Sequence, residues 1–232
     1  MLGEFSILSF KRLYALKKLT LIALFTLACK VNAGIIPVGV QNDIAISQVT
    51  ADWGWTLCYQ GTYASSVSVA NMFSACNGDY VMLASELNGS GVLDVLAAAL
   101  FTDVTTYTAY NTTHTANDVN WYFNGGSMGF AGLGDSIYQS SADIEGSSWR
   151  GTPENDRLSW HTMGGYNTLP TAVSGGWRSG TNITLNSATN WNRLVFTANA
   201  SPAPAAVPEP ASVAMFGLGL LALSGLRRRK AR

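Results

Sequence analysis

His161 belongs to a set of residue types that could hydrolyse an ester. The stretch Gly125–Gly129 reads Gly-Gly-Ser-Met-Gly and matches the Gly-x-Ser-x-Gly pattern, in which Ser127 would be the nucleophile. Asp156 and His161 then follow in the chain order Ser, Asp, His that some hydrolases use. That pattern requires a helix directly after the serine turn, and the residues that follow the motif are poor helix formers. We therefore assign no catalytic residue and keep a secreted esterase as an alternative.

Metal and glycosidase chemistry have weaker support. His114 and His161 are the only histidines, and no short ligand spacing joins them to cysteines or carboxylates, so we expect neither a metal nor a cofactor. Glycoside cleavage by two carboxylates follows no spacing rule in a sequence, so it stays a second hydrolase alternative. The expectation is a protein without enzymatic activity.

Tryptophans are the other side chains suited to a chemical role. Aromatic rings stack on sugar faces while neighbouring carboxylates and amides bind the hydroxyl groups. Four tryptophans stand beside Gly, Asp or Arg, where strand ends and loops are expected, and these are the candidate glycan contacts: Trp53, Trp55, Trp149 and Trp177. The alternative is that each of them fills the core.

The charges are separated along the chain. The net charge is zero, because 14 Lys and Arg balance 14 Asp and Glu. Residues 34–206, however, contain no lysine, four arginines and a net charge of about −8. Nucleic acid requires clustered Lys and Arg, so we expect no nucleic-acid binding. The abundance of Gly, Ser, Thr, Asn and aromatic residues is typical of an extracellular β-protein.

The elements that must position these residues are mostly strands. Residues 34–200 are long enough for one core, and we expect one β-rich extracytoplasmic domain there. Residues 34–50 are expected to form a loose segment, with a short helix within 67–73 and a buried strand within 79–87. After Asp118, short apolar segments separated by Gly, Asn and Pro predict further strands. The predicted fold is mainly β, a single sandwich of the jelly-roll type with one short helix.

The first 33 residues have the features of a signal peptide. A basic stretch, KRLYALKK, precedes the apolar run LTLIALFTLA. Val31 and Ala33 are small residues at the −3 and −1 positions of a signal-peptidase site, which predicts cleavage after Ala33. The apolar run is too short for a resident membrane helix. A lipoprotein signal at Cys29 and an uncleaved anchor are the alternatives.

Cys58 and Cys76 remain after removal of that signal. In an oxidising compartment we expect them to form a disulfide, which would stabilise the fold by about 3 kcal/mol. Two buried thiols are the alternative.

The C-terminal tail, residues 208–232, has three parts. A Pro-Glu-Pro step at Pro208, Glu209 and Pro210 follows a Pro/Ala linker at 201–207. Residues 211–226 carry no charge and would be roughly 24 Å long as a helix, sufficient for a transmembrane segment with arginines at its edge. The basic end, 227–232, is expected to stay cytoplasmic, which places the domain beyond the inner membrane.

These three parts, together with a signal peptide, resemble the PEP-CTERM sorting signal of Gram-negative bacteria. The resemblance implies that exosortase, a membrane-embedded transpeptidase-like enzyme, recognises Pro208, Glu209 and Pro210 and releases or transfers the protein outward. It implies a transient inner-membrane anchor and then a cell-surface or extracellular location. Such sorting systems accompany exopolysaccharide production. A plain tail anchor in the periplasm is the alternative.

The body resembles a domain of secreted bacterial proteins that has no established activity. The resemblance runs along residues 53–196 through GWTLCYQGTY, ACNGDYVMLAS, NWYFNGGSMGFA, RLSWHT and GGWRSG. In that pattern cysteines stand where this chain has Ser159 and Ser179, which implies that their two strands are neighbours. We therefore expect an exported, non-enzymatic surface or matrix protein of a biofilm, associated with exopolysaccharide and processed by signal peptidase and exosortase.

Overall fold

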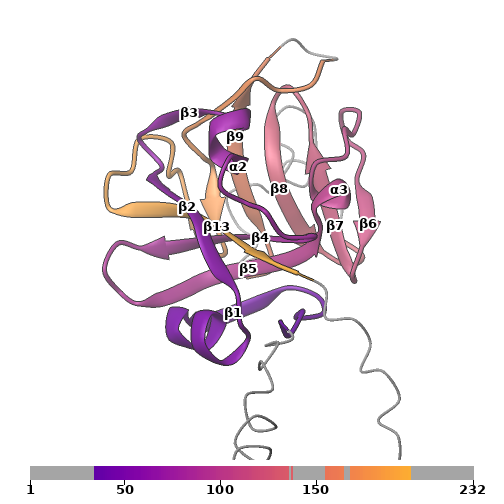
Figure 1. Cartoon of the computed structure of the whole chain (residues 1–232). Helices are drawn as coiled ribbons and strands as arrows, with labels where there is room; N and C mark the ends of the chain where they lie inside the picture. Colours follow the sequence, from indigo (N-terminus) through magenta and orange to yellow (C-terminus); the bar gives the residue numbers. More distant parts are fainter. Residues whose placement is uncertain (1–33, 136, 138–154, 165–167, 200–232) are drawn as a thin grey trace, which may run out of the picture. The chain divides into compact units, whose positions relative to one another are not determined.

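The computed structural model of the chain describes residues 34–135, 137, 155–164 and 168–199, which form two antiparallel sheets (Figure 1). The first sheet has the order β1 (Gln41–Ala45), β5 (Val92–Leu100), β4 (Tyr80–Leu87), β13 (Trp191–Ala198), β2 (Thr56–Thr62). The second has the order β12 (Asn182–Ile183), β11 (Arg178–Ser179), β9 (Leu158–Met163), β8 (Ser127–Gly132), β7 (Val119–Phe123), β6 (His114–Ala116). β10 (Ala172–Ser174) pairs with β9 and with β3 (Ser66–Ser68).

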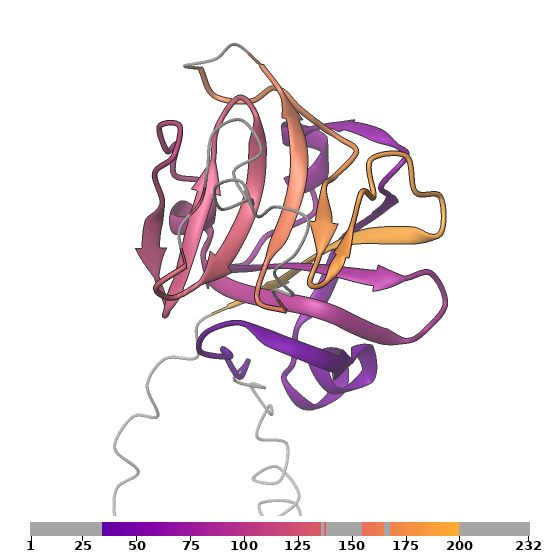
Figure 2. The same ribbon diagram turned by 180° about the vertical axis from the view of Figure 1, so that it is seen from behind.

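The core lies between the two sheets. Val81 and Leu83 of β4 face the second sheet and are fully buried against its aromatic residues, among them Trp121 and Trp160. Trp121 meets Phe130 edge to face, with 5.4 Å between ring centroids. The strands β4 and β5 run across the view, whereas β7, β8 and β9 run nearly at right angles to them (Figures 1 and 2). The predicted β-sandwich is therefore confirmed, with steeply crossed sheets.

The strand order differs from a jelly roll. A jelly roll alternates successive strands between its two sheets. Here β6, β7, β8 and β9 are consecutive neighbours in one sheet, as in a meander. Two- and three-residue turns join β6 to β7 and β7 to β8, so each of these strands pairs with the next before it can cross to the other layer. β9 pairs with β8 after the longer connection 133–157.

The segment predicted to be loose is ordered. β1 pairs with β5, and the short π-helix η1 (Gln48–Asp52) follows it. Val49 and Trp55 are buried against Met82 and Leu194 on the outer face of the first sheet. That face is apolar because β4, β5 and β13 carry hydrophobic residues on both sides, so it needs a cover. The N-terminal segment supplies it.

The helices are short. The predicted helix is α2 (Val69–Phe73), which Ser68 caps by accepting a hydrogen bond from the backbone N–H of Asn71 at 3.1 Å. A further α-helix, α3 (Phe101–Val104), ends the long apolar run that begins as β5. The expectation of one helix was therefore too low, because four- and five-residue elements leave little periodicity in a sequence.

Cys58 of β2 and Cys76 after α2 form the predicted disulfide. It attaches the α2 segment to the edge of the first sheet. The two strands that carry Ser159 and Ser179 are neighbours, as the resemblance implied, because β9 pairs with β11. Ser179 donates a hydrogen bond to Asp94 and contacts Ser85, so it links the two sheets.

Arg193 is buried in the same interior. Its Nη1 donates to the carbonyl of Gly175 at 3.1 Å, and its Nη2 donates to the carbonyl of Thr62 at 2.9 Å and to that of Ser65. Its guanidinium also lies 6.0 Å from the centre of the Tyr63 ring. Burial lowers the pKa of Arg193, but an arginine stays charged at any physiological pH. One cation thereby joins β13 to two separate loops.

The second glycine of the Gly-x-Ser-x-Gly motif has a structural role. A Cβ on Gly129 would lie 2.0 Å from the carbonyl oxygen of Leu158 on β9. The Tyr122 hydroxyl donates to that same oxygen at 2.6 Å. Gly129 therefore allows the β8 and β9 backbones and the Tyr122 ring to meet.

We expect Gly129→Ala to lower the free energy of unfolding by about 3 kcal/mol, because backbone atoms cannot yield to the new methyl group. Gly132→Ala in the same strand is the control. Its Cβ would meet only the side chains of Asp156 and Asp135, at 3.2 Å and beyond, so its cost should stay near 1 kcal/mol. Denaturant unfolding of both variants tests this, and equal losses would contradict it.

Candidate functional site

Trp177 differs from the other described tryptophans. Trp55, Trp121 and Trp160 are buried in the hydrophobic clusters, and Trp53 and Trp191 pack against them. Trp177 is half-buried and belongs to none of these clusters. A large aromatic side chain held outside the core is a candidate for ligand contact.

Two glycines place Trp177. Gly175 has a φ of +81°, and a Cβ there would lie 2.3 Å from the side-chain oxygen of Asn186. A Cβ on Gly176 would lie 2.3 Å from the Tyr63 ring. The backbone N–H of Trp177 donates to the carbonyl of Ser159 at 2.9 Å, which fixes the residue beside β9. The sequence Ser-Gly-Gly-Trp is therefore needed for this turn.

His161 and Asn186 complete the arrangement. The imidazole of His161 stacks on the indole of Trp177, with 6.3 Å between centroids and 27° between planes. His161 Nδ1 lies 3.0 Å from Asn186 Oδ1. An amide oxygen only accepts, so neutral His161 carries its proton on Nδ1 and keeps Nε2 as an acceptor. We call Trp177, His161 and Asn186 the Trp177 platform.

Ser127 lies directly opposite His161 in the β8–β9 ladder, so their side chains share one face of the second sheet. Asp156 does not join them. Its Oδ1 accepts a hydrogen bond from Asn42 Nδ2 at 2.8 Å, and Asn186 occupies the Nδ1 side of His161. Ser127 is also fully buried and begins a strand of a hairpin, not a helix. The predicted order Ser, Asp, His therefore does not assemble as a triad.

The other candidate glycan contacts lie elsewhere. Trp55 is 2% exposed and its Nε1 donates to the carbonyl of Ile35 at 2.8 Å, so no ring face is available to a sugar and this expectation was wrong. Trp53 is half-buried and packs against the cover of the first sheet. Trp149 lies outside the described residues. So do the signal-peptidase and sorting positions, Val31, Ala33, Pro208, Glu209 and Pro210.

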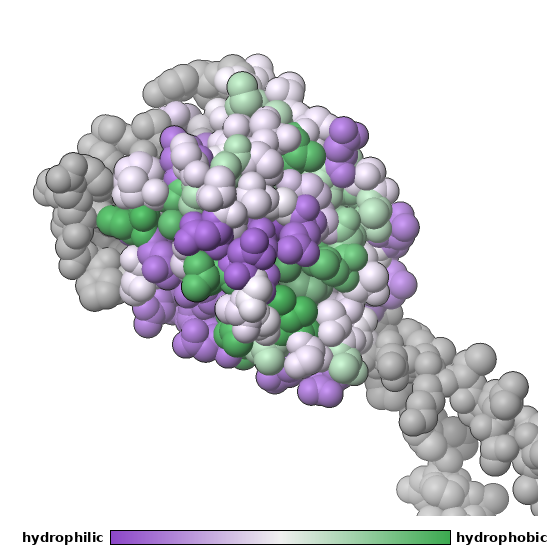
Figure 3. Space-filling model, turned by 90° about the vertical axis from the view of Figure 1, so that its left-hand side faces the viewer, coloured by the Kyte–Doolittle hydropathy of each residue, from purple (hydrophilic) through white to green (hydrophobic). Residues whose placement is uncertain are grey.

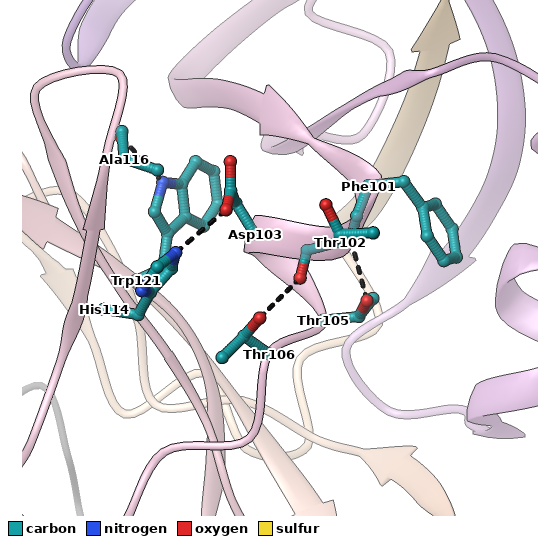
Figure 4. Close-up of polar contacts among 8 residues, drawn as sticks. All are labelled: Phe101, Thr102, Asp103, Thr105, Thr106, His114, Ala116 and Trp121. Carbon is teal, nitrogen blue, oxygen red and sulfur yellow. Dashed lines mark hydrogen bonds and ion pairs between the residues drawn. The ribbon is translucent and has the colours of Figure 1, made fainter.

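His114 has a local partner. Its Nε2 lies 2.9 Å from Asp103 Oδ1, which links β6 to α3 (Figure 4). Within the described ranges, no three His, Cys, Asp or Glu residues gather as a metal site. The arginines in those ranges, Arg157, Arg178 and Arg193, are all buried.

Comparison with known proteins identifies the end of the chain. Residues 206–230 match the family model described as the PEP-CTERM protein-sorting motif. The tail thus carries a PEP-CTERM sorting motif, which implies export to the cell surface or beyond and processing by exosortase. No curated protein and no solved structure matches it. Among the helices that the structure describes, none is long and apolar enough to cross a membrane.

Sequence reasoning missed Asn186. Nothing in its own neighbourhood marks it, because one partner, His161, is 25 residues away and the other is the Gly175 turn. The available signal was the Gly-Gly pair before Trp177, which predicts a close backbone approach.

The environment of His161 predicts a pH dependence of stability. Burial lowers the pKa of His161, and the Asn186 hydrogen bond offsets this in part. The unfolded chain takes up a proton near pH 6.5, where the folded state is still neutral. The unfolded state then binds more protons, so the free energy of unfolding should fall as the pH drops below about 6.5.

Urea unfolding at about pH 7.5 and about pH 5.5 measures this slope. His161→Gln should reduce it, whereas His114→Gln should leave that part of it unchanged. A slope that survives in His161→Gln and disappears in His114→Gln would show that His114 causes the pH dependence, and would contradict this prediction.

Proposed function

We propose that this protein is a non-enzymatic component of the cell surface or extracellular matrix that binds exopolysaccharide through the Trp177 platform. The observation that carries the proposal is Trp177 itself. It lies outside the core, and two glycines and a stacked imidazole hold it in place.

The platform suits a sugar physically. An indole offers a flat apolar surface to the C–H face of a pyranose, and the Asn186 amide can donate to a hydroxyl group while its oxygen binds His161. Fixed side chains lose little entropy on binding, so a preformed site can bind a sugar through few contacts.

The distribution of hydrophobic residues on one face of the molecule favours a hydrophilic partner. On the face shown in Figure 3, hydrophobic residues form small groups separated by hydrophilic ones. A continuous apolar patch would instead favour docking of another protein. The PEP-CTERM motif supports this proposal, because export to the cell surface or beyond would bring the domain to where a secreted polysaccharide could be bound.

We expect Trp177→Ala to weaken binding to the exopolysaccharide of the producing cells by about tenfold, through loss of the stacking surface. Tyr107→Ala, which removes an aromatic ring that is 36% exposed, is the matched control and should bind normally. Affinity electrophoresis of the exported protein in gels that contain the polysaccharide measures both. Absence of binding by the natural protein, or equal binding by Trp177→Ala, would contradict the proposal.

A hydrolase is the second candidate, favoured by the pairing of Ser127 with His161. Neutral His161 keeps Nε2 as an acceptor, and Asn186 orients the ring as a carboxylate would. The burial of the serine opposes this function, because a substrate carbonyl must reach its hydroxyl oxygen.

One assay distinguishes the two candidate functions, polysaccharide binding without catalysis and ester hydrolysis. We expect no turnover of nitrophenyl esters above the buffer rate and no phosphonylation by a fluorophosphonate probe, because Ser127 is enclosed. Labelling that Ser127→Ala abolishes, together with ester turnover, would replace the non-enzymatic proposal with the hydrolase. Mass spectrometry of the labelled peptide identifies the residue.

A further inference from the structure

A cleft lies beside the disulfide, at the junction of β4, β5 and α3. Its volume is about 490 Å³, which is within the range of small-ligand sites. The lining residues are Cys76, Asn77, Gly78, Asp79, Tyr80, Leu100, Phe101 and Thr102. Tyr80 and Leu100 face each other across the β4–β5 ladder and supply apolar surface.

The polar side-chain atoms of this cleft form no hydrogen bond within the described residues, although the Tyr80 ring also packs against the cover of the first sheet. Asn77, Asp79, Tyr80 and Thr102 bond to their described neighbours through backbone atoms only or not at all. The residues that line the cleft thus include an amide, a carboxylate and two hydroxyls. The neighbouring carboxylate of Asp103 is paired with His114, whereas the Asp79 carboxylate has no partner among the described residues.

The walls of the cleft are held from several sides. The Gly78 N–H donates to Thr197 Oγ1 at 2.8 Å, and the Phe101 N–H donates to the carbonyl of Asp79 at 2.8 Å. Phe101 also packs edge to face on Phe73, with centroids 5.2 Å apart.

Figure 4 shows the α3 side, where Thr105 and Thr106 donate to the carbonyls of Phe101 and Thr102 at 2.7 and 2.6 Å. Together with the Cys58–Cys76 bond, these contacts preform the site.

The charges of the domain limit the chemical class of ligand that this cleft could bind. Residues 34–206 contain no lysine, and every arginine within the described ranges is at most 3% exposed. This part of the surface thus has no arginine or lysine to bind a uronate or a phosphate. The lining instead presents a carboxylate, and the surrounding domain is acidic, which attracts a cation.

We propose that this cleft binds a cationic amino sugar of the exopolysaccharide, with the Asp79 carboxylate opposite the ammonium group and Tyr80 against the sugar ring. This inference rests on the proposed function, because it specifies which class of sugar in the exopolysaccharide the protein binds. It adds a site distinct from the Trp177 platform in its residues. Two sites on one domain would let it hold two chain segments, with the gain in avidity that such linkage gives.

Titration of the exported protein with glucosamine oligomers, their N-acetylated counterparts and a polyuronate tests the proposal. The natural protein should prefer the glucosamine oligomer, and Asp79→Asn should weaken its binding about tenfold while binding of the acetylated oligomer changes little. Asp52→Asn, which removes the same charge from exposed residue Asp52, is the control and should keep the preference. The Asp79 side chain holds no described contact, so the variant should fold.

The outcomes separate the two proposals. If Asp79→Asn binds glucosamine oligomers as the natural protein does, or if the polyuronate binds as tightly, the amino-sugar site is wrong even where Trp177 still binds exopolysaccharide. If Asp79-dependent binding of glucosamine is present but native exopolysaccharide does not bind, the cleft stands and the proposed function fails.

Discussion

The burial of the Arg193 guanidinium is the constraint on which the arrangement of the domain depends. A charge in this interior must be satisfied, and in the described part of the chain its acceptors come from the turn after β2 and from Gly175. Those contacts fix both loops to the central strand β13. Gly175 begins the turn that carries Trp177, so the surface platform takes its position from a cation inside the sandwich. Tyr63 joins the same network, donating to the carbonyl of Arg178 and accepting from Trp160.

The strands of the body could be predicted because their patterns are strong. Segments such as those around Leu83, Trp121, Trp160 and Phe196 alternate or run apolar between turn residues, and each is a strand. The role of the N-terminal segment could not be predicted, since its apolar residues are spaced irregularly and matter only once the outer face of β4 and β5 needs a cover. Sheet order was also beyond reach, because turn signals mark where strands end and not which strands pair.

The sites differ in the same way, because some are marked by a local sequence pattern and others are not. The disulfide follows from composition and compartment, and the sorting motif from three adjacent parts of one tail. The Trp177 platform and the Asp79 cleft depend on residues brought together from distant strands, so no local pattern shows them. The Gly-x-Ser-x-Gly motif illustrates the opposite error. Its last glycine serves the packing of Tyr122 against Leu158, and a short pattern cannot distinguish that use from catalysis.

The strand that connects the domain to its tail is paired on both of its sides. β13 lies between β4 and β2 and is hydrogen-bonded to both along nearly its whole length, ending at Ala198 opposite Tyr80. Hydrogen bonds in an antiparallel ladder run perpendicular to the strands. A mechanical pull on the chain beyond Asn199, directed along β13, therefore loads both ladders in shear, with many bonds resisting together and none peeling first. A pull applied through that end would therefore meet the resistance of both neighbouring strands at once, rather than separating β13 one hydrogen bond at a time.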